Sequence, residues 1–125
     1  MQDRVVNLDR AFASFSEHWS PRLAGEFNGM VVKLVKLQGE FVWHRHEDAD
    51  EMFLVTRGAL RIGFRDREVT VRPGEFYIIP RGVEHITAAG EETHALILEP
   101  AGTLNTGNVE NERSVHSEGV IAQLE

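Results

Sequence analysis

The sequence contains no cysteine. Disulfides, thiolate nucleophiles and cysteine-based zinc or iron–sulfur sites are therefore excluded, so any bound metal must be held by histidine and carboxylate side chains. The sequence also lacks an apolar run long enough to cross a bilayer, and its first residues contain no apolar signal core. We therefore expect a cytoplasmic protein that does not bind membranes.

Positive charge is also scarce. Thirteen Lys and Arg residues stand against 20 Asp and Glu residues, which gives a net charge of −7. Because nucleic-acid phosphates require clustered Lys and Arg, we expect no nucleic-acid partner. No glycine-rich fingerprint for a nucleotide cofactor is present. Most arginines between positions 57 and 81 fall on solvated strand positions, although Arg57 and Arg81 lie at turns and could hold an anionic substrate.

The 125 residues are 42% hydrophobic and 26% charged, as is usual for one globular domain. Near the N-terminus, five apolar residues recur at spacings of three and four, with Asn7 as a candidate N-cap and Pro21 beyond the end. They are Leu8, Ala11, Phe12, Phe15 and Trp19. This pattern predicts a helix, or a pair of turns, that packs against the outside of a sheet.

After residue 21 the pattern becomes that of short strands. Asn28-Gly29 is a hairpin signal, and Leu60, Ile62 and Phe64 alternate with polar or small residues. Strands are predicted at 22–27, 30–37, 41–46, 51–56, 60–64, 69–71, 76–79 and 93–98. Many short strands with regular turns indicate an all-β sandwich or barrel.

We therefore predict one domain over residues 1–125. In this division, 1–21 is an N-terminal helical extension, 22–98 is a barrel, and 99–125 is an irregular C-terminal tail. Val120, Ile121 and Leu124 give the end of that tail apolar side chains to bury.

Four side chains have the spacing of a metal site. His44 and His46 are two residues apart, so both rings point to the same face of a strand. Glu51 opens the next strand, and His85 follows a turn that brings a third segment to the same place. Three imidazoles and one carboxylate suit a first-row divalent metal and leave coordination positions for water or substrate.

Strand alternation places Glu51 on the same face as Phe53 and Val55, which is the core-facing set. A buried carboxylate is costly unless it is paired or bound to a metal. The rival carboxylate, Asp50, falls on the opposite face and is the less favoured ligand.

The remaining histidines, His18, His94 and His116, have no partner at metal-ligand spacing and are interpreted as structural. For His94 a role in the site stays open as an alternative, because its strand could face a cavity.

Two segments of the chain resemble the paired motifs of the cupin superfamily. They read Gly39-x4-His44-x-His46-x4-Glu51-x6-Gly58 and Gly74-x5-Pro80-x-Gly82-x2-His85. The resemblance implies a small jelly-roll barrel, the double-stranded β-helix, in which His44, His46, Glu51 and His85 bind one metal ion. The chain departs from the pattern in two ways: the first motif is one residue short before His44, and Ala89 replaces a frequent Asn.

The donor set admits Fe, Mn, Ni, Co, Cu or Zn. The resemblance implies an enzyme that acts on a small oxygen-rich molecule, such as a sugar derivative, keto acid or diol. Isomerase, lyase and dioxygenase chemistry all fit the superfamily. The alternative is a non-catalytic cupin that binds a small molecule and contains a structural metal.

No general base is identified from the sequence. Tyr77, Glu84 and His94 are candidates because they lie near the motifs. The expected apolar cavity wall consists of Val42, Phe53, Val55, Ile62 and Phe64.

We also expect a homodimer. Small cupins commonly pair through sheet edges, and edge strands favour such pairing generally. Outward-facing Trp43 and Met52, together with the apolar stripe of residues 7–19, supply surface that a second subunit could bury.

Overall fold

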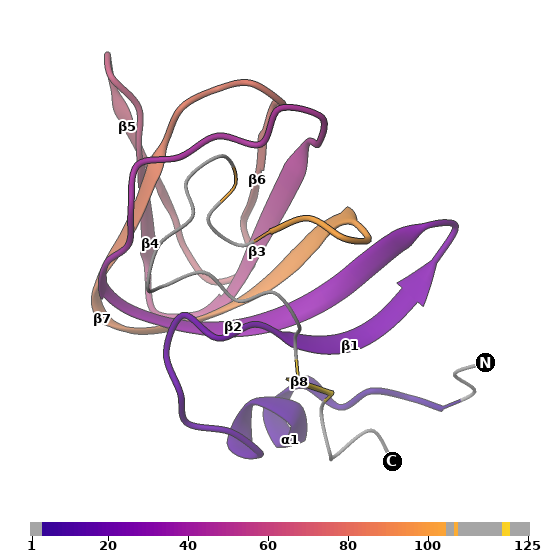
Figure 1. The fold of residues 1–125 in the computed structure, drawn as a ribbon. Helices are drawn as coiled ribbons and strands as arrows, with labels where there is room; N and C mark the ends of the chain where they lie inside the picture. Colours follow the sequence, from indigo (N-terminus) through magenta and orange to yellow (C-terminus); the bar gives the residue numbers. More distant parts are fainter. Residues whose placement is uncertain (1–3, 105–106, 108–118, 121–125) are drawn as a thin grey trace.

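The computed structural model of the protein describes residues 4–104, 107, 119 and 120. In this part of the chain, one helix precedes eight strands (Figure 1). The helix is α1 (Leu8–Ala13). The strands are β1 (Arg22–Phe27), β2 (Met30–Glu40), β3 (Glu51–Arg57), β4 (Leu60–Gly63), β5 (Glu68–Val71), β6 (Phe76–Ile79), β7 (Ile86–Pro100) and β8 (Gly119–Val120).

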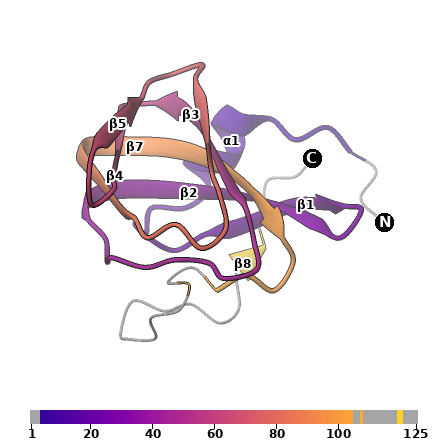
Figure 2. The same cartoon turned by 90° about the horizontal axis from the view of Figure 1, so that it is seen from above.

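The strands form a mostly antiparallel barrel in which β7 is the central element. Its last part pairs with β3 on one edge, while its first part pairs with β4. The other edge of β7 follows β2 along almost its whole length. β5 and β6 extend the sheet beyond β4 and β3, respectively. The strands therefore curve around an interior, as the view from above shows (Figure 2). This is the jelly-roll fold expected from the sequence.

Alternation along the strands fills that interior. Val35 and Leu37 of β2 lie in one apolar cluster with Phe53 of β3, Ile62 of β4 and Ile97 of β7. The opposite face of β2 is also buried, because α1 packs there. Leu34 belongs to a second cluster with Ala11 and Phe12 of the helix. Both views show α1 outside the barrel, next to β1 and β2 (Figures 1 and 2).

The N-terminal helix begins where the sequence indicates but is shorter than the apolar stripe. Asn7 is the N-cap, and its side chain accepts a hydrogen bond of 3.0 Å from the Arg10 N–H. The helix ends at Ala13 because the backbone that follows makes hydrogen bonds to β2 instead of continuing the helix. The Lys36 ammonium donates to the Phe15 carbonyl, and the Trp19 N–H donates to the Lys36 carbonyl. Of the two predicted alternatives, the structure shows the helix, and an irregular segment follows it.

Most strand predictions agree with the structure. The Asn28-Gly29 hairpin is present, with positive φ at both residues and Phe27 paired with Met30. Leu60, Ile62 and Phe64 are buried as their alternation indicates. The strand predicted at 93–98 is longer and runs from Ile86 to Pro100. The exposed residues 90–92 interrupt its apolar pattern and conceal this continuity in the sequence.

The prediction of a regular strand at 41–46 is wrong. Phe41 bonds to Thr87, His44 bonds to His85, and the Gly82 N–H donates to the His46 carbonyl. The register changes between these contacts, so only an isolated bridge between His44 and His85 remains. The alternation of side chains survives, and His44 and His46 are both buried.

Beyond β7 the structure describes only part of the predicted tail. Gly119 and Val120 pair in parallel with Arg22 and Leu23 of β1. Ile121 and Leu124, which were expected to be buried, lie outside the described residues. Within the described residues, no helix has the length and apolar character needed to span a bilayer.

Candidate metal centre

Three separate segments bring the four predicted ligands together. His44 and His46 come from the irregular segment before β3, Glu51 is the first residue of β3, and His85 directly precedes β7. Two backbone hydrogen bonds of 3.0 and 2.9 Å join His44 to His85. The backbone itself therefore holds two of the imidazoles side by side, with ring centroids 4.4 Å apart.

The four side chains form one compact, buried group. One potential ligand atom from each of His44, His46, Glu51 and His85 lies within 4.8 Å of the others. The Glu51 Oε1 atom is 3.4 Å from His46 Nε2 and 3.7 Å from His85 Nε2. The exposed fraction of every member is at most 6%. The distances suit atoms that surround a common point.

Backbone carbonyls orient two of the imidazoles. His44 Nδ1 lies 2.8 Å from the Val42 carbonyl, and His85 Nδ1 lies 2.9 Å from the Val83 carbonyl. A carbonyl only accepts, so each Nδ1 carries a proton, and in the neutral ring Nε2 then has the lone pair that a metal can bind. Such a bond sets the tautomer and ring direction of a metal-ligating histidine.

The protonation states also suit ligation. Burial lowers the pKa of His44 from 6.5 to about 4, with a further contribution from His85. Burial alone would raise the pKa of Glu51, but the adjacent His46 and His85 imidazoles and the Glu99 carboxyl group outweigh it and hold the pKa well below its usual range. A neutral imidazole and an ionised carboxylate are the forms that bind a divalent cation.

Three buried polar atoms in this group have no hydrogen-bond partner: His46 Nε2, Glu51 Oε1 and His85 Nε2. Buried polar atoms without a partner are rare in proteins, because each carries a desolvation penalty. Here the unpartnered atoms converge, and all are donor types that transition metals accept. The residues present therefore fit a bound divalent metal.

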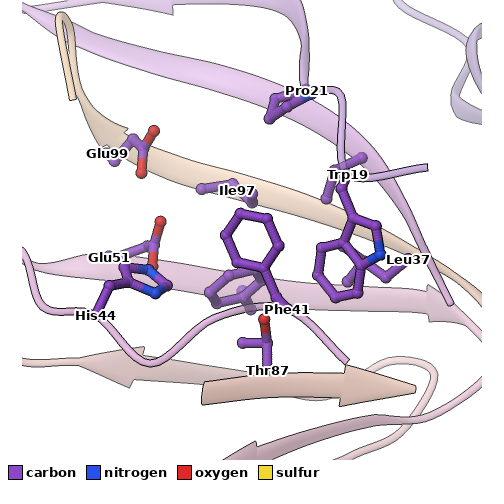
Figure 3. Close-up of a pocket in the computed structure, with 11 residues that line it drawn as sticks. Trp19, Pro21, Leu37, Phe41, His44, Glu51, Thr87, Ile97 and Glu99 are labelled. Atoms are coloured by element: carbon purple, nitrogen blue, oxygen red, sulfur yellow. The ribbon is translucent and has the colours of Figure 1, made fainter. Parts of the chain in front are cut away.

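A small pocket opens beside His44 (Figure 3). Glu51, Glu99 and His44 lie at one end of it, and Trp19 lies at the other. The Phe41 ring stands between them, with its centroid 5.7 Å from His44 and 4.7 Å from Trp19. The cavity volume is about 40 Å³.

Comparison with known proteins decides the family. The family model described as Cupin domain matches residues 30–99, which include all four members of the buried group. The chain belongs to the cupin family. Both motifs singled out in the sequence fall within the matched region.

Relatives of this cupin share its fold over most of the chain. The crystal structure of a cupin-2 domain protein from Shewanella frigidimarina is 51% identical, with a TM-score of 0.76, covering 77% of this chain and 94% of that one. Protein NMB1881 from Neisseria meningitidis is 28% identical, with a TM-score of 0.72, covering 78% and 99%. The uncharacterized protein YdbB of Bacillus subtilis is 39% identical over 59% of this chain. That match spans 66% of YdbB, just under two thirds of its length.

The cupin barrel also buries an ion pair that the sequence analysis missed. The Lys33 ammonium lies 2.7 Å from a Glu99 carboxylate oxygen, and both side chains are 2% exposed. Burial, together with the adjacent Glu51 carboxylate, raises the pKa of Glu99, and Lys33 opposes this shift. Glu99 therefore joins Lys33 and the candidate ligand Glu51 in one buried charged group.

Alternation along the strands was the signal that could have found this pair. Glu99 faces inward like Thr93, Ala95 and Ile97 before it, but the predicted strand stopped at residue 98. Lys33 shares the inward face of β2 with Val35.

The two candidate anion-binding arginines lie away from the pocket. Arg81 bonds to Asp50 through its backbone N–H and its side chain, which also explains why Asp50 is no rival to Glu51 as a ligand. Arg57 lies across the sheet near Glu92 and His94. Neither arginine is among the described residues that line the pocket beside His44.

The three candidate bases also interact with residues away from the pocket. The Tyr77 hydroxyl accepts a hydrogen bond from Arg67, and Glu84 accepts one from Arg65. The His94 ring stacks on Phe12 of the helix, outside the barrel. Proximity to the motifs in sequence did not translate into proximity to the site.

The cavity wall differs from the expected one. Of the five predicted residues, only Phe53 lines the pocket. Val55, Ile62 and Phe64 fill the adjoining core instead. Part of the wall comes instead from Val35, Leu37 and Ile97 of β2 and β7. The rest comes from Trp19, Pro21 and Phe41, which lie outside the regular strands and carried no period-two signal.

Proposed function

We propose that this cupin is a metal-dependent enzyme whose His44, His46, Glu51 and His85 hold one divalent transition metal. The observation that carries the proposal is the convergence of three unpartnered buried donor atoms, one each from His46, Glu51 and His85. A purely structural group of this kind would satisfy its polar atoms with each other or with the backbone.

The pocket beside His44 favours a catalytic role for the metal over a structural one. Four protein ligands leave two positions of a six-coordinate ion free, and this pocket supplies a route to them. When bound, the metal would supply Lewis-acid stabilisation of an enolate, or a site for substrate and dioxygen together, so isomerase, lyase and dioxygenase reactions all remain candidates. The apolar walls would exclude water from the reacting group.

The protein's own residues have definable tasks in such a reaction. The Val42 and Val83 carbonyls keep the His44 and His85 rings aimed inward. Glu99 lines the pocket next to Glu51, and burial together with Glu51 raises the pKa of its carboxyl group, so we assign to Glu99 the task of taking up and returning a proton there. The substrate would be a small molecule with one oxygen-bearing end that reaches the ligand group.

Elemental analysis of untagged protein tests the proposal. We expect about one Fe, Mn, Ni, Co, Cu or Zn per chain. The metal should be lost in both His46→Ala and Glu51→Ala. His18→Ala is the matched control, because His18 pairs with Glu92 on the surface and should leave metal content unchanged.

Absence of metal in the wild-type protein, even after reconstitution, would refute the metalloenzyme. Retention of metal in both variants would show that the ion binds elsewhere. A full metal complement in a protein that turns over no small molecule would favour the non-catalytic alternative.

A further inference from the structure

The wall of the pocket is unusually apolar for a site that would handle sugars. Trp19 and Phe41 form its outer part, and their rings stack with centroids 4.7 Å apart at an interplanar angle of 12°. Its other apolar lining residues are Pro21, Val35, Leu37, Phe53 and Ile97. A sugar would have to leave several hydroxyl groups unpaired against such a wall, and each unpaired group costs binding free energy.

Trp19 is held firmly in this position. Its backbone has a φ of 58°, a left-handed conformation that is rare for a bulky residue. Its N–H donates to the Lys36 carbonyl, and its indole Nε1–H donates to the Gln38 carbonyl, both at 2.9 Å. Strained conformations of this kind persist only where surrounding contacts impose them, and they concentrate at functional sites. Both polar groups of Trp19 are thus satisfied away from the pocket, which leaves the ring face as the surface it offers.

The charges around the pocket restrict the ligand further. Among the described residues that line it, none is Lys or Arg. The two carboxyl groups, Glu51 and Glu99, lie at the end next to His44, and Lys33 is already paired with Glu99. A ligand with an anionic group away from the metal would find no cation to pair with.

We infer that the substrate is a small, flat molecule that chelates the metal through oxygens at one end and places an uncharged apolar ring or short chain against Trp19 and Phe41. The cavity of about 40 Å³ is smaller than an aromatic ring, so the apolar part must lie partly in the open mouth, against the half-buried Trp19 and Phe41. The inference rests on the proposed function, because the chelating end requires a metal at His44, His46, Glu51 and His85. It narrows the expected oxygen-rich substrates to those with an apolar face.

Two hydroxamic acids test this inference on protein loaded with Co²⁺. Acetohydroxamic and benzohydroxamic acid share one chelating head and differ by a methyl or a phenyl group. Isothermal titration should show that the phenyl compound binds about ten-fold more tightly, from apolar burial and ring stacking. A carboxylate at the para position of the phenyl ring should remove this advantage.

Substitutions of Trp19 and Phe41 test whether these side chains cause the tighter binding of the phenyl compound. Trp19→Ala should bring the two affinities to within about two-fold, whereas Trp19→Phe should restore most of the difference because it keeps an aromatic face. Phe41→Leu should also reduce the difference in affinity between the two compounds, and this test does not depend on residue 19. Trp43→Ala is the control, because Trp43 stacks with Arg65 and does not line the pocket.

The outcomes separate the two proposals. Equal affinity for both compounds in the wild-type protein would overturn the apolar substrate class but leave the metal site intact. A phenyl preference that survives Trp19→Ala and Phe41→Leu would also overturn it. Failure of both compounds to bind a protein that contains cobalt would overturn the open metal site itself, and with it the proposed function.

Discussion

Lys33 and Glu99 form an ion pair that is buried inside the barrel. The cation lies 2.7 Å from a Glu99 carboxylate oxygen, and Glu99 in turn lies next to Glu51. The Lys33 ammonium also donates to the Thr103 carbonyl at 3.3 Å, which ties β2 to the chain that follows β7. A buried charge stays in place only when such partners surround it.

Removal of that cation should be costly. We expect Lys33→Met to lower the free energy of unfolding by about 3 to 5 kcal/mol, because it leaves Glu99 and Glu51 facing each other without a counter-charge. The double variant Lys33→Met/Glu99→Leu should recover most of this loss. Urea denaturation of both variants measures the difference. Equal destabilisation in the single and double variants would show that the pair matters for packing and not for charge.

His44 makes the stability of the metal-free protein depend on pH. Its pKa is about 4 in the folded protein against an ordinary value of 6.5, so the unfolded chain binds a proton that the folded chain resists. The stabilisation is complete above pH 6.5 and is lost as the pH falls towards 4. The loss should be on the order of 3 kcal/mol.

Chemical denaturation of metal-free protein between those pH values measures this effect. His44→Gln should flatten the profile because it removes the titrating group. An equally steep profile in His44→Gln would assign the effect to another group.

The turn between β3 and β4 must fit closely against β7. Gly58 has a φ of 83°, and a Cβ atom there would lie 2.8 Å from the Glu92 carbonyl oxygen and 2.9 Å from the Thr93 Cα atom. The buried Thr93 hydroxyl bonds to the N–H and carbonyl of Ala59. Gly74 has nearly the same φ, 85°, but open space around it.

These two glycines separate backbone strain from steric conflict. Gly74→Ala should cost about 1 kcal/mol, from the left-handed backbone alone. Gly58→Ala should cost about 3 kcal/mol, since it adds a conflict with backbone atoms that cannot move aside easily. Thermal unfolding of the two variants gives the comparison. Similar losses at both positions would mean that β7 shifts freely to make room.

The surface around β6 supports the expected homodimer. β6 pairs with β3 and with no other described strand, so it offers a free edge. Phe76 and Ile78 on this strand are 59% and 51% exposed, and half-buried Met52 and Leu54 face the same side of β3. An apolar edge of this kind favours pairing with another copy.

We predict a homodimer through the β6 edge. Light scattering coupled to size exclusion should give about twice the 14.1 kDa of one chain. Phe76→Lys/Ile78→Lys should give a monomer with unchanged metal content, because neither side chain belongs to the metal group. A wild-type particle of 14.1 kDa would refute the dimer, and a dimeric double variant would place the interface elsewhere.

Local patterns in the sequence were enough to predict an all-β sandwich or barrel and the group of four side chains, and the resemblance to cupins narrowed the fold to a jelly-roll barrel. Spacing of two residues put His44 and His46 on one face, and alternation with Phe53 chose Glu51 over Asp50. Asn7 and Asn28-Gly29 marked the start of the helix and the first hairpin, because side-chain capping and positive φ are properties of short segments.

Contacts between distant segments were beyond such patterns. The stacking of Trp19 on Phe41 depends on hydrogen bonds from Trp19 to the β2 backbone, which competed with continuation of the helix. The proximity of Glu99 to Glu51 depends on how far β7 extends and what it pairs with. Periodicity reports which face a side chain occupies, but pairing across the barrel determines which side chains meet there.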